Sequence, residues 1–261
     1  MITIKENTLE RISTWTKDSI YVLTDFDHTL TSGDSTTSWG ILEDSTYLPA
    51  EYNQERQKLS NHYGPIEFDE TIPEESKKIS MNEWWTKHLN LFIKYRLSEE
   101  AVLNETSSLK TMILRPGTKE LLKKLADDKI PVIIVSAGIG NYIESCLKSN
   151  NCYYDNIHII SNFLKFENSY ATGIKSNLIH SLNKNEVSLS NEIKEYIQNR
   201  KNIILFGDHT GDTNMTQDKN ALKIGFLEKN VTQNKPYYEE KFDLVCIESD
   251  FNEIINTITI L

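Results

Sequence analysis

One stretch decides the fold of this chain: Ile20-Tyr21-Val22-Leu23-Thr24-Asp25-Phe26-Asp27-His28-Thr29. Its first half is a continuous apolar run, which is typical of a strand buried on both faces of a parallel sheet. Its second half places two aspartates one residue apart where that strand ends. In open α/β sheets, ligands bind beyond the carboxyl ends of the strands. We therefore interpret Asp25 and Asp27 as a reactive pair: one carboxylate can attack phosphorus while the next handles a proton, and both can hold a hard cation.

Two further apolar runs end in polar or glycine-containing turns. Residues 131–135 precede Ser136-Ala137-Gly138, and residues 202–206 precede Gly207-Asp208. Helical patterns lie between the strands, and two weaker strand signals complete the alternation. The fold class that this predicts is α/β, with a Rossmann-like, doubly wound parallel sheet. The weaker strands are expected at 158–160 and 243–247, and the helices at 119–126, 141–149 and 191–198.

An insertion separates the first strand from the second. Roughly a hundred residues lie between them, which is too many for one crossover helix. Apolar residues recur at helical spacing over 81–93 and again over 98–103, while Pro116 and Gly117 mark the return to the sheet. We predict that residues 1–31 and 114–261 form the core domain. Residues 32–113 are expected to form a mostly helical cap inserted after the first catalytic strand.

Composition restricts the partners and the compartment. The chain has 261 residues and a formal net charge of −10, which disfavours nucleic acid or an anionic membrane surface as a partner. No apolar run approaches the length of a membrane span, no signal peptide is visible, and no obligate protein partner is evident. The three cysteines form no C-x-x-C pair and are expected to be reduced structural thiols. We expect a cytoplasmic protein.

Three more signals fall at strand ends or shortly after them. Ser136-Ala137-Gly138-Ile139-Gly140 offers a hydroxyl and backbone N–H groups at a helix start, which suits either a phosphate cradle or a purely structural turn. Lys175 is the candidate cation between the carboxylates and an anionic ligand. Asp208 and Asp212 can add a metal carboxylate and a supporting one, or form an ordinary Asx turn. An all-oxygen donor set favours Mg²⁺.

In this order, the signals resemble the four motifs of the haloacid dehalogenase superfamily. The likeness is closer still to the cytosolic type III 5′-nucleotidases, also called pyrimidine 5′-nucleotidases. It runs from about residue 20 to the C-terminus. The stretches that support it are 62–67, 83–87, 136–140, 178–180 and 222–227.

The resemblance implies a role for each motif residue. Asp25 would be the nucleophile that becomes an aspartyl-phosphate, and Asp27 would be the general acid and base. Mg²⁺ would be held by Asp25, by the backbone carbonyl of Asp27 and by Asp208. Asp212 would orient the metal site. The groups that would bind the phosphoryl oxygens are Ser136, Ala137 and Lys175.

The cap is where the resemblance places substrate choice. Glu67, Trp85 and His88 are the residues expected to recognise the nucleoside; of the adjacent Trp84 and Trp85, at most one can stack on a base. The segment 32–39 is shorter than its family equivalent and lacks the usual Arg-Phe and cysteine pairs. His88 stands where pyrimidine-selective members carry serine. The identity of the base therefore stays open.

The expected function is Mg²⁺-dependent hydrolysis of a small phosphate ester, with nucleoside 5′-monophosphates of the pyrimidine or 7-methylguanosine type first. One alternative keeps the mechanism and changes the substrate to a sugar phosphate or phosphoserine. Another is a non-enzymatic binding protein on a hydrolase scaffold. Phosphotransfer to an acceptor alcohol is a possible side activity, because any alcohol that reaches an aspartyl-phosphate can intercept it.

Overall fold

A seven-stranded sheet forms the centre of the protein in the computed structural model, which describes residues 1–43, 47–69, 71–108, 111–186 and 189–261. The strand order is β1-β9-β8-β7-β2-β3-β4. All neighbours are parallel except β1 and β9. The strand bounds are β1 Ile2–Ile4, β2 Ile20–Thr24, β3 Val132–Ile139, β4 Ile157–Asn162, β7 Asn202–Gly207, β8 Leu222–Phe226 and β9 Leu244–Cys246.

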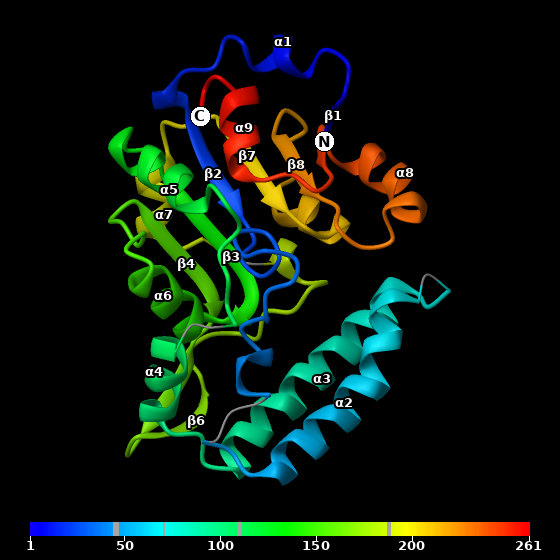
Figure 1. Cartoon of the computed structure of the whole chain (residues 1–261), viewed down its shortest axis with the longest axis vertical. Helices are drawn as coiled ribbons and strands as arrows, with labels where there is room; N and C mark the ends of the chain where they lie inside the picture. The colour runs from blue at the N-terminus through cyan, green and yellow to red at the C-terminus, as the bar shows by residue number, and fades with distance from the viewer. Residues whose placement is uncertain (44–46, 70, 109–110, 187–188) are drawn as a thin grey trace.

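Alternate residues of the central strands pack on opposite faces of the sheet. On one face, Val22, Ile134 and Phe206 join a large apolar cluster with three helices: α5 (Thr118–Asp127), α6 (Gly140–Ser149) and α9 (Phe251–Thr257). On the other face, Leu23 and Leu205 pack with α7 (Asn191–Ile197) and α8 (Val231–Lys241). Helices cover both faces, as Figure 1 also shows. The predicted doubly wound α/β sheet is therefore confirmed.

Some elements are absent from the sequence prediction. The antiparallel edge strand β1 and the strand β8 are two of them. A third is a separate antiparallel hairpin of β5 (Leu164–Glu167) and β6 (Tyr170–Ile174), which leaves the sheet directly after β4. The short helix α1 (Thr8–Ile12) follows β1. No helix within the described residues is long and apolar enough to cross a membrane.

Between β2 and α5, the described residues form three α-helices and the short 3₁₀ helix Gly40–Leu42. The helices α2 (Ala50–Phe68) and α3 (Glu74–Lys94) pack as a hairpin beyond the carboxyl ends of the strands, whereas α4 (Glu99–Ser108) packs on α6 (Figure 1). Acidic residues in the first turn of α3 and Lys94 in its last turn complement the helix dipole. An antiparallel bridge joins Thr31 to Leu114 at the expected base of the insertion. The division into a core and a cap at these positions stays a prediction.

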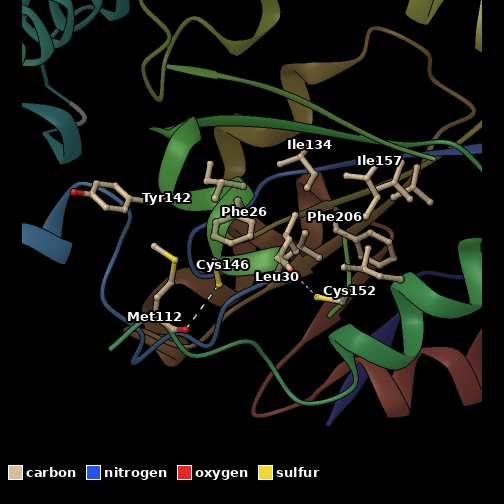
Figure 2. Close-up of a cluster of buried hydrophobic side chains, with 14 of the residues drawn as sticks. Phe26, Leu30, Met112, Ile134, Tyr142, Cys146, Cys152, Ile157 and Phe206 are labelled. Carbon is tan, nitrogen blue, oxygen red and sulfur yellow. Dashed lines mark hydrogen bonds between the residues drawn. The ribbon is translucent and has the colours of Figure 1, made fainter. Parts of the chain in front are cut away.

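Phe26, the residue between the two aspartates, anchors the loop after β2 in the core. Its side chain is fully buried and lies in a cluster with Leu30, Ile134 and Phe206 (Figure 2). The backbone carbonyl of Phe26 accepts hydrogen bonds from the N–H groups of Thr29, Leu30 and Thr31. The loop is thus closed on itself, and its apolar anchor leaves the aspartates on either side at the edge of the sheet. All three cysteines are free and buried, as expected.

Candidate active site

Carboxylates from two neighbouring strand ends meet above the sheet. Asp25 follows β2, Asp208 follows β7, and Asp212 lies in the short 3₁₀ helix Thr210–Met215. One oxygen from each of the three lies within 4.8 Å of the other two. The Thr29 hydroxyl donates to Asp208 Oδ1 at 3.3 Å, which ties the two loops together. Parallel strands end at the same edge of the sheet, and this brings residues almost two hundred positions apart into contact.

Lys184 is the cation that contacts this cluster in the described part of the chain. Its Nζ lies 2.9 Å from Asp25 Oδ1 and 2.7 Å from Asp212 Oδ1. The lysine is 5% exposed, so its charge is held almost entirely out of water. A buried ammonium needs carboxylates close by, and here it bridges two of them.

The prediction of Lys175 as this cation is wrong. Lys175 follows β6 at the base of the β5–β6 hairpin, is exposed, and holds its Nζ 5.8 Å from the centre of the Phe163 ring. The chain returns to the strand ends only after the hairpin, where the Asn162 side chain hydrogen-bonds both backbone groups of Ile179. The sequence offers several lysines between β4 and β7, and no periodic pattern separates Lys184 from the others.

The loop after β7 holds Asp212 in a fixed orientation. Asp212 Oδ2 accepts hydrogen bonds from the backbone N–H groups of Asp208 at 3.2 Å and His209 at 3.0 Å. Gly207 makes this packing possible, since a Cβ at that position would lie 2.5 Å from the Asp212 Cβ. Both Asp212 oxygens therefore have donors, one from Lys184 and one from the loop, which suits the expected supporting role beside a metal.

Burial raises the pKa values of three carboxyl groups in this site, which favours their protonated forms. Burial raises the pKa of Asp25 to about 6 against the opposing effect of Lys184, and it raises the pKa of Asp27 to about 6 against the hydrogen bond from Ser38. Burial and the neighbouring carboxylates also raise the pKa of Asp208 well above its ordinary value. For Lys184, burial opposes the charge, but Asp212 and Asp25 outweigh it and raise its pKa. The site therefore holds more acidic groups than its one contacting lysine neutralises.

Arg115 holds the backbone of the loop that follows Asp27. It is 3% exposed, and its Nε donates to the Thr29 carbonyl at 2.8 Å while Nη2 donates to the His28 carbonyl. Nη1 pairs with Glu228, and the guanidinium lies 3.9 Å from the centre of the Phe226 ring. His28 has a φ of 59°, a left-handed conformation that a non-glycine residue adopts only where its surroundings enforce it. No pattern in the sequence predicts this role for Arg115, which stands directly before Pro116.

The last residues of β3, where the pairing with β4 shifts register between Val135 and Ile139, combine a buried hydroxyl with a carbonyl that accepts several hydrogen bonds; the sequence had predicted a turn here. Ser136 is 1% exposed and its Oγ accepts from the Gly138 N–H at 3.1 Å. The Ala137 carbonyl accepts from three side chains: Trp39 Nε1 at 2.7 Å, Asn162 Nδ2 at 2.8 Å and Trp85 Nε1 at 3.3 Å. Ser136 and Ala137 both line the cleft, as expected of a phosphate cradle. The Ala137 carbonyl also joins the α3 helix to the sheet.

A cleft of about 1170 Å³ extends from the aspartates to the α2–α3 hairpin. That volume accommodates a ligand larger than phosphate alone. The expected residues Glu67, Trp85 and His88 all line it, together with Trp39, which the sequence analysis left out. The Trp39 ring lies 4.8 Å from the His88 ring and 5.9 Å from the Trp85 ring, centre to centre. These aromatic rings form one wall of the cleft.

His88 is expected to make folding stability depend on pH. Burial and the charge of Arg56 lower its pKa to about 3, and its Nε2 lies 2.9 Å from the Tyr52 hydroxyl. The unfolded chain binds a proton at this histidine near pH 6.5, whereas the folded one does not, so stability falls as the pH drops from about 6.5 towards 3. Between pH 7 and 5 the loss is about 2 kcal/mol.

Urea unfolding of the wild type and of His88→Gln at the two pH values measures this effect. Groups common to both proteins, including the carboxylates and His180, cancel in the difference. We expect the wild type to lose about 2 kcal/mol more than the variant between pH 7 and 5. Parallel pH profiles for the two proteins would contradict a neutral, buried His88.

Comparison with known proteins identifies relatives along nearly the whole chain. The model of the family "Pyrimidine 5′-nucleotidase (UMPH-1)" matches residues 21–260. The 7-methylguanosine phosphate-specific 5′-nucleotidase of Homo sapiens is 32% identical over 250 residues, covering 92% of this chain and 83% of that protein. The Drosophila melanogaster protein of the same name is 33% identical over 254 residues, covering 92% and 79%.

Solved structures give the same answer. The crystal structure of cytosolic 5′-nucleotidase IIIB bound to cytidine has a TM-score of 0.89 and 29% identity, covering 98% of this chain and 92% of that one. A substrate-bound phosphoserine phosphatase, at 21% identity and a TM-score of 0.58, shares the fold alone. The resemblance expected from the strand-end motifs is thereby confirmed. The chain belongs to the pyrimidine 5′-nucleotidase (UMPH-1) family of phosphoric monoester hydrolases.

Proposed function

We propose that this protein hydrolyses nucleoside 5′-monophosphates to nucleoside and phosphate, with Mg²⁺ and through an aspartyl-phosphate on Asp25. One observation carries the proposal: a nucleophilic carboxylate, a second carboxylate two residues on, and a buried lysine lie together at the mouth of a cleft long enough for a nucleoside. Phosphoryl transfer needs positioning and charge neutralisation more than covalent chemistry, and this arrangement supplies both.

The acidic cluster fits a hard divalent cation. Oxygen atoms of Asp25, Asp208 and Asp212 lie close together in a buried site, and one lysine in contact does not balance them. We assign Mg²⁺ to Asp25, the Asp27 backbone carbonyl and Asp208, with Asp212 as the supporting carboxylate. When bound, the ion neutralises charge on the transferring phosphoryl group.

The chain's own residues carry the two chemical steps. A carboxylate oxygen of Asp25 attacks phosphorus, and the bond between phosphorus and the ribose oxygen breaks as Asp27 gives that oxygen a proton. Asp27 then takes a proton from water, which attacks the same phosphorus and releases phosphate from Asp25. Both aspartates return to their starting states. Ser136, the backbone at Ala137 and Lys184 hold the phosphoryl oxygens through both steps.

The wall of the cleft favours a 7-methylguanosine nucleotide among the candidates. The 7-methylated base carries a positive charge, which prefers the faces of aromatic rings and nearby carboxylates. Trp39 and Trp85 supply the rings, and Glu67 and Glu43 supply carboxylates, although Arg56 pairs with Glu43 at 2.8 Å. The relatives from Homo sapiens and Drosophila melanogaster are named for this substrate, and a related structure holds cytidine, so CMP is the second candidate.

A panel of phosphate esters tests this proposal with released phosphate as the readout. It contains 7-methyl-GMP, CMP, UMP, phosphoserine and a sugar phosphate, each with Mg²⁺ and with EDTA. We expect turnover of 7-methyl-GMP first and CMP second, and loss of turnover in EDTA. Equal, slow rates on all nucleotides with rapid turnover of phosphoserine or the sugar phosphate would contradict the proposal that nucleotides are the substrates.

Glu67→Gln tests the recognition half of the proposal within the same panel. Loss of a charge-assisted hydrogen bond to the base is expected to raise KM for the preferred nucleotide by about tenfold, with a smaller change in kcat. Glu51→Gln, at an exposed position on the same helix, is the matched control. If both variants behave alike, Glu67 does not contact the base.

The proposal also covers the binding partner of the protein and its cellular compartment. The partner is the small phosphate ester itself, with no nucleic acid or membrane required. The names of two relatives contain the word cytosolic, which supports the cytoplasm as the compartment.

A further inference from the structure

Ser38 makes the hydrogen bonds that hold the carboxylate of Asp27. Its backbone N–H donates to Asp27 Oδ1 at 2.9 Å, and its hydroxyl donates to Asp27 Oδ2 at 2.7 Å. The Ser38 Oγ in turn accepts from the Ile139 N–H at 3.0 Å. Because the backbone N–H fills the acceptor side of the hydroxyl, the hydroxyl proton is directed at the aspartate. One residue therefore fixes both oxygens of the carboxyl group.

The surrounding structure is shaped for this contact. Ser38 is completely buried, so neither of its hydrogen bonds competes with water. A Cβ on Gly138 would lie 2.1 Å from the Ser38 Oγ and 3.0 Å from Asp27 Oδ2, so only glycine leaves room for the pair. The next residue, Trp39, donates to the Ala137 carbonyl. The segment that leads into the α2–α3 hairpin is thus bound to the end of β3 at two successive residues.

We propose that Ser38 is a positioning residue for proton transfer by Asp27, and that it ties this proton transfer to the segment leading into the cap. The inference rests on the proposed function, in which Asp27 protonates the leaving oxygen. A carboxyl group that could rotate about its side-chain bonds would spend less time aimed at that oxygen, and proton transfer depends steeply on such geometry. Ser38 removes this freedom without touching the substrate.

How strongly a misplaced Asp27 slows cleavage of an ester depends on the leaving group of that ester. The alkoxide of an alkyl alcohol such as ribose is a poor leaving group, so the departing oxygen needs a proton from Asp27 as the bond breaks. The p-nitrophenolate anion is stable and leaves without one. Misplacing Asp27 should therefore lower kcat/KM, which reports the steps up to release of the leaving group, for alkyl esters and spare it for p-nitrophenyl phosphate, whereas general damage to the site would lower both alike.

The test compares kcat/KM on these two esters for the wild type and for Ser38→Ala, because kcat also contains the water-activation step that both esters share. We expect kcat/KM to fall by about tenfold on the alkyl ester and by less than about twofold on p-nitrophenyl phosphate. Ser38→Thr, which keeps the hydroxyl, should restore the wild-type ratio of the two kcat/KM values. Ser35→Ala is the matched control: its buried hydroxyl lies in the same segment and, among the described residues, hydrogen-bonds backbone groups alone, so its ratio should equal that of the wild type.

The alkyl ester is the fastest nucleotide of the panel or, if no nucleotide is hydrolysed, its fastest other alkyl phosphate. A wild type inactive on every nucleotide would overturn the proposed substrate while the ratio still tests Ser38. An unchanged ratio in Ser38→Ala, or the same change in Ser35→Ala, would overturn the positioning role.

Discussion

Asp25→Asn should abolish phosphatase turnover while the protein stays folded. The amide cannot attack phosphorus, and we expect kcat to fall on the order of 10⁴-fold or more on every ester. The replacement is nearly isosteric and removes one negative charge from a buried cluster that already holds Asp208 and Asp212. The metal-free variant should therefore melt at the same temperature as the wild type or higher, because crowded buried carboxylates repel each other.

Steady-state release of phosphate and thermal unfolding followed by circular dichroism measure the two halves of this prediction. Trapping of radiolabelled phosphate on the protein adds a direct readout, since the wild type should label at Asp25 and the variant should not. Asp18→Asn, on a surface turn before β2, is the control for losing one aspartate. Substantial turnover by Asp25→Asn would remove Asp25 from the role of nucleophile.

Lys184→Met is expected to have the second-largest effect. Removing the ammonium leaves Asp25 and Asp212 without their contacting cation. It also removes a positive charge that would stabilise the negative charge developing on the phosphoryl group in the transition state. We expect kcat to fall on the order of 10²–10³-fold. Loss of one partner from a buried ion pair also destabilises the fold, by about 3–5 kcal/mol.

Lys175→Met is the matched control, because it makes the same chemical change at an exposed lysine nine residues earlier. Its activity and stability should stay close to those of the wild type. Phosphate release and urea unfolding of the two variants side by side give the comparison. A large loss in Lys175→Met with little loss in Lys184→Met would restore the assignment made from sequence.

The central sheet and its first two acids could be predicted because both depend on short-range patterns. Strands buried on both faces read as unbroken apolar runs, and the aspartates sit directly after one of them. The helix α2 gave no such signal, since few of its side chains face the core and it lacks an apolar stripe. The three-residue strand β1 is defined by its partner β9 rather than by its own residues.

The residues of the candidate site likewise differ in how far short-range patterns predict them. Asp25, Ser136 and Asp208 follow predicted strands, so their meeting follows from the topology of a parallel sheet. Lys184 and Ser38 reach the site through irregular segments whose paths depend on tertiary contacts, such as the hydrogen bonds of Asn162 with Ile179. The sequence therefore predicted a cation beside the carboxylates but placed it at Lys175, whereas Lys184 makes the contact.

The pairing of β1 with β9 has a consequence for how the chain reaches its fold. Ile2 lies opposite Cys246, so two segments that are far apart in the sequence pair with each other. The central strand β2 likewise waits for β3 and β7, which follow long intervals of chain. Contacts this far apart in sequence slow folding, because the entropy of closing each loop is lost before the contact rewards it. The α2–α3 hairpin, whose contacts are local, can form during this delay, so these two helices are expected to be in place before the sheet beneath them closes.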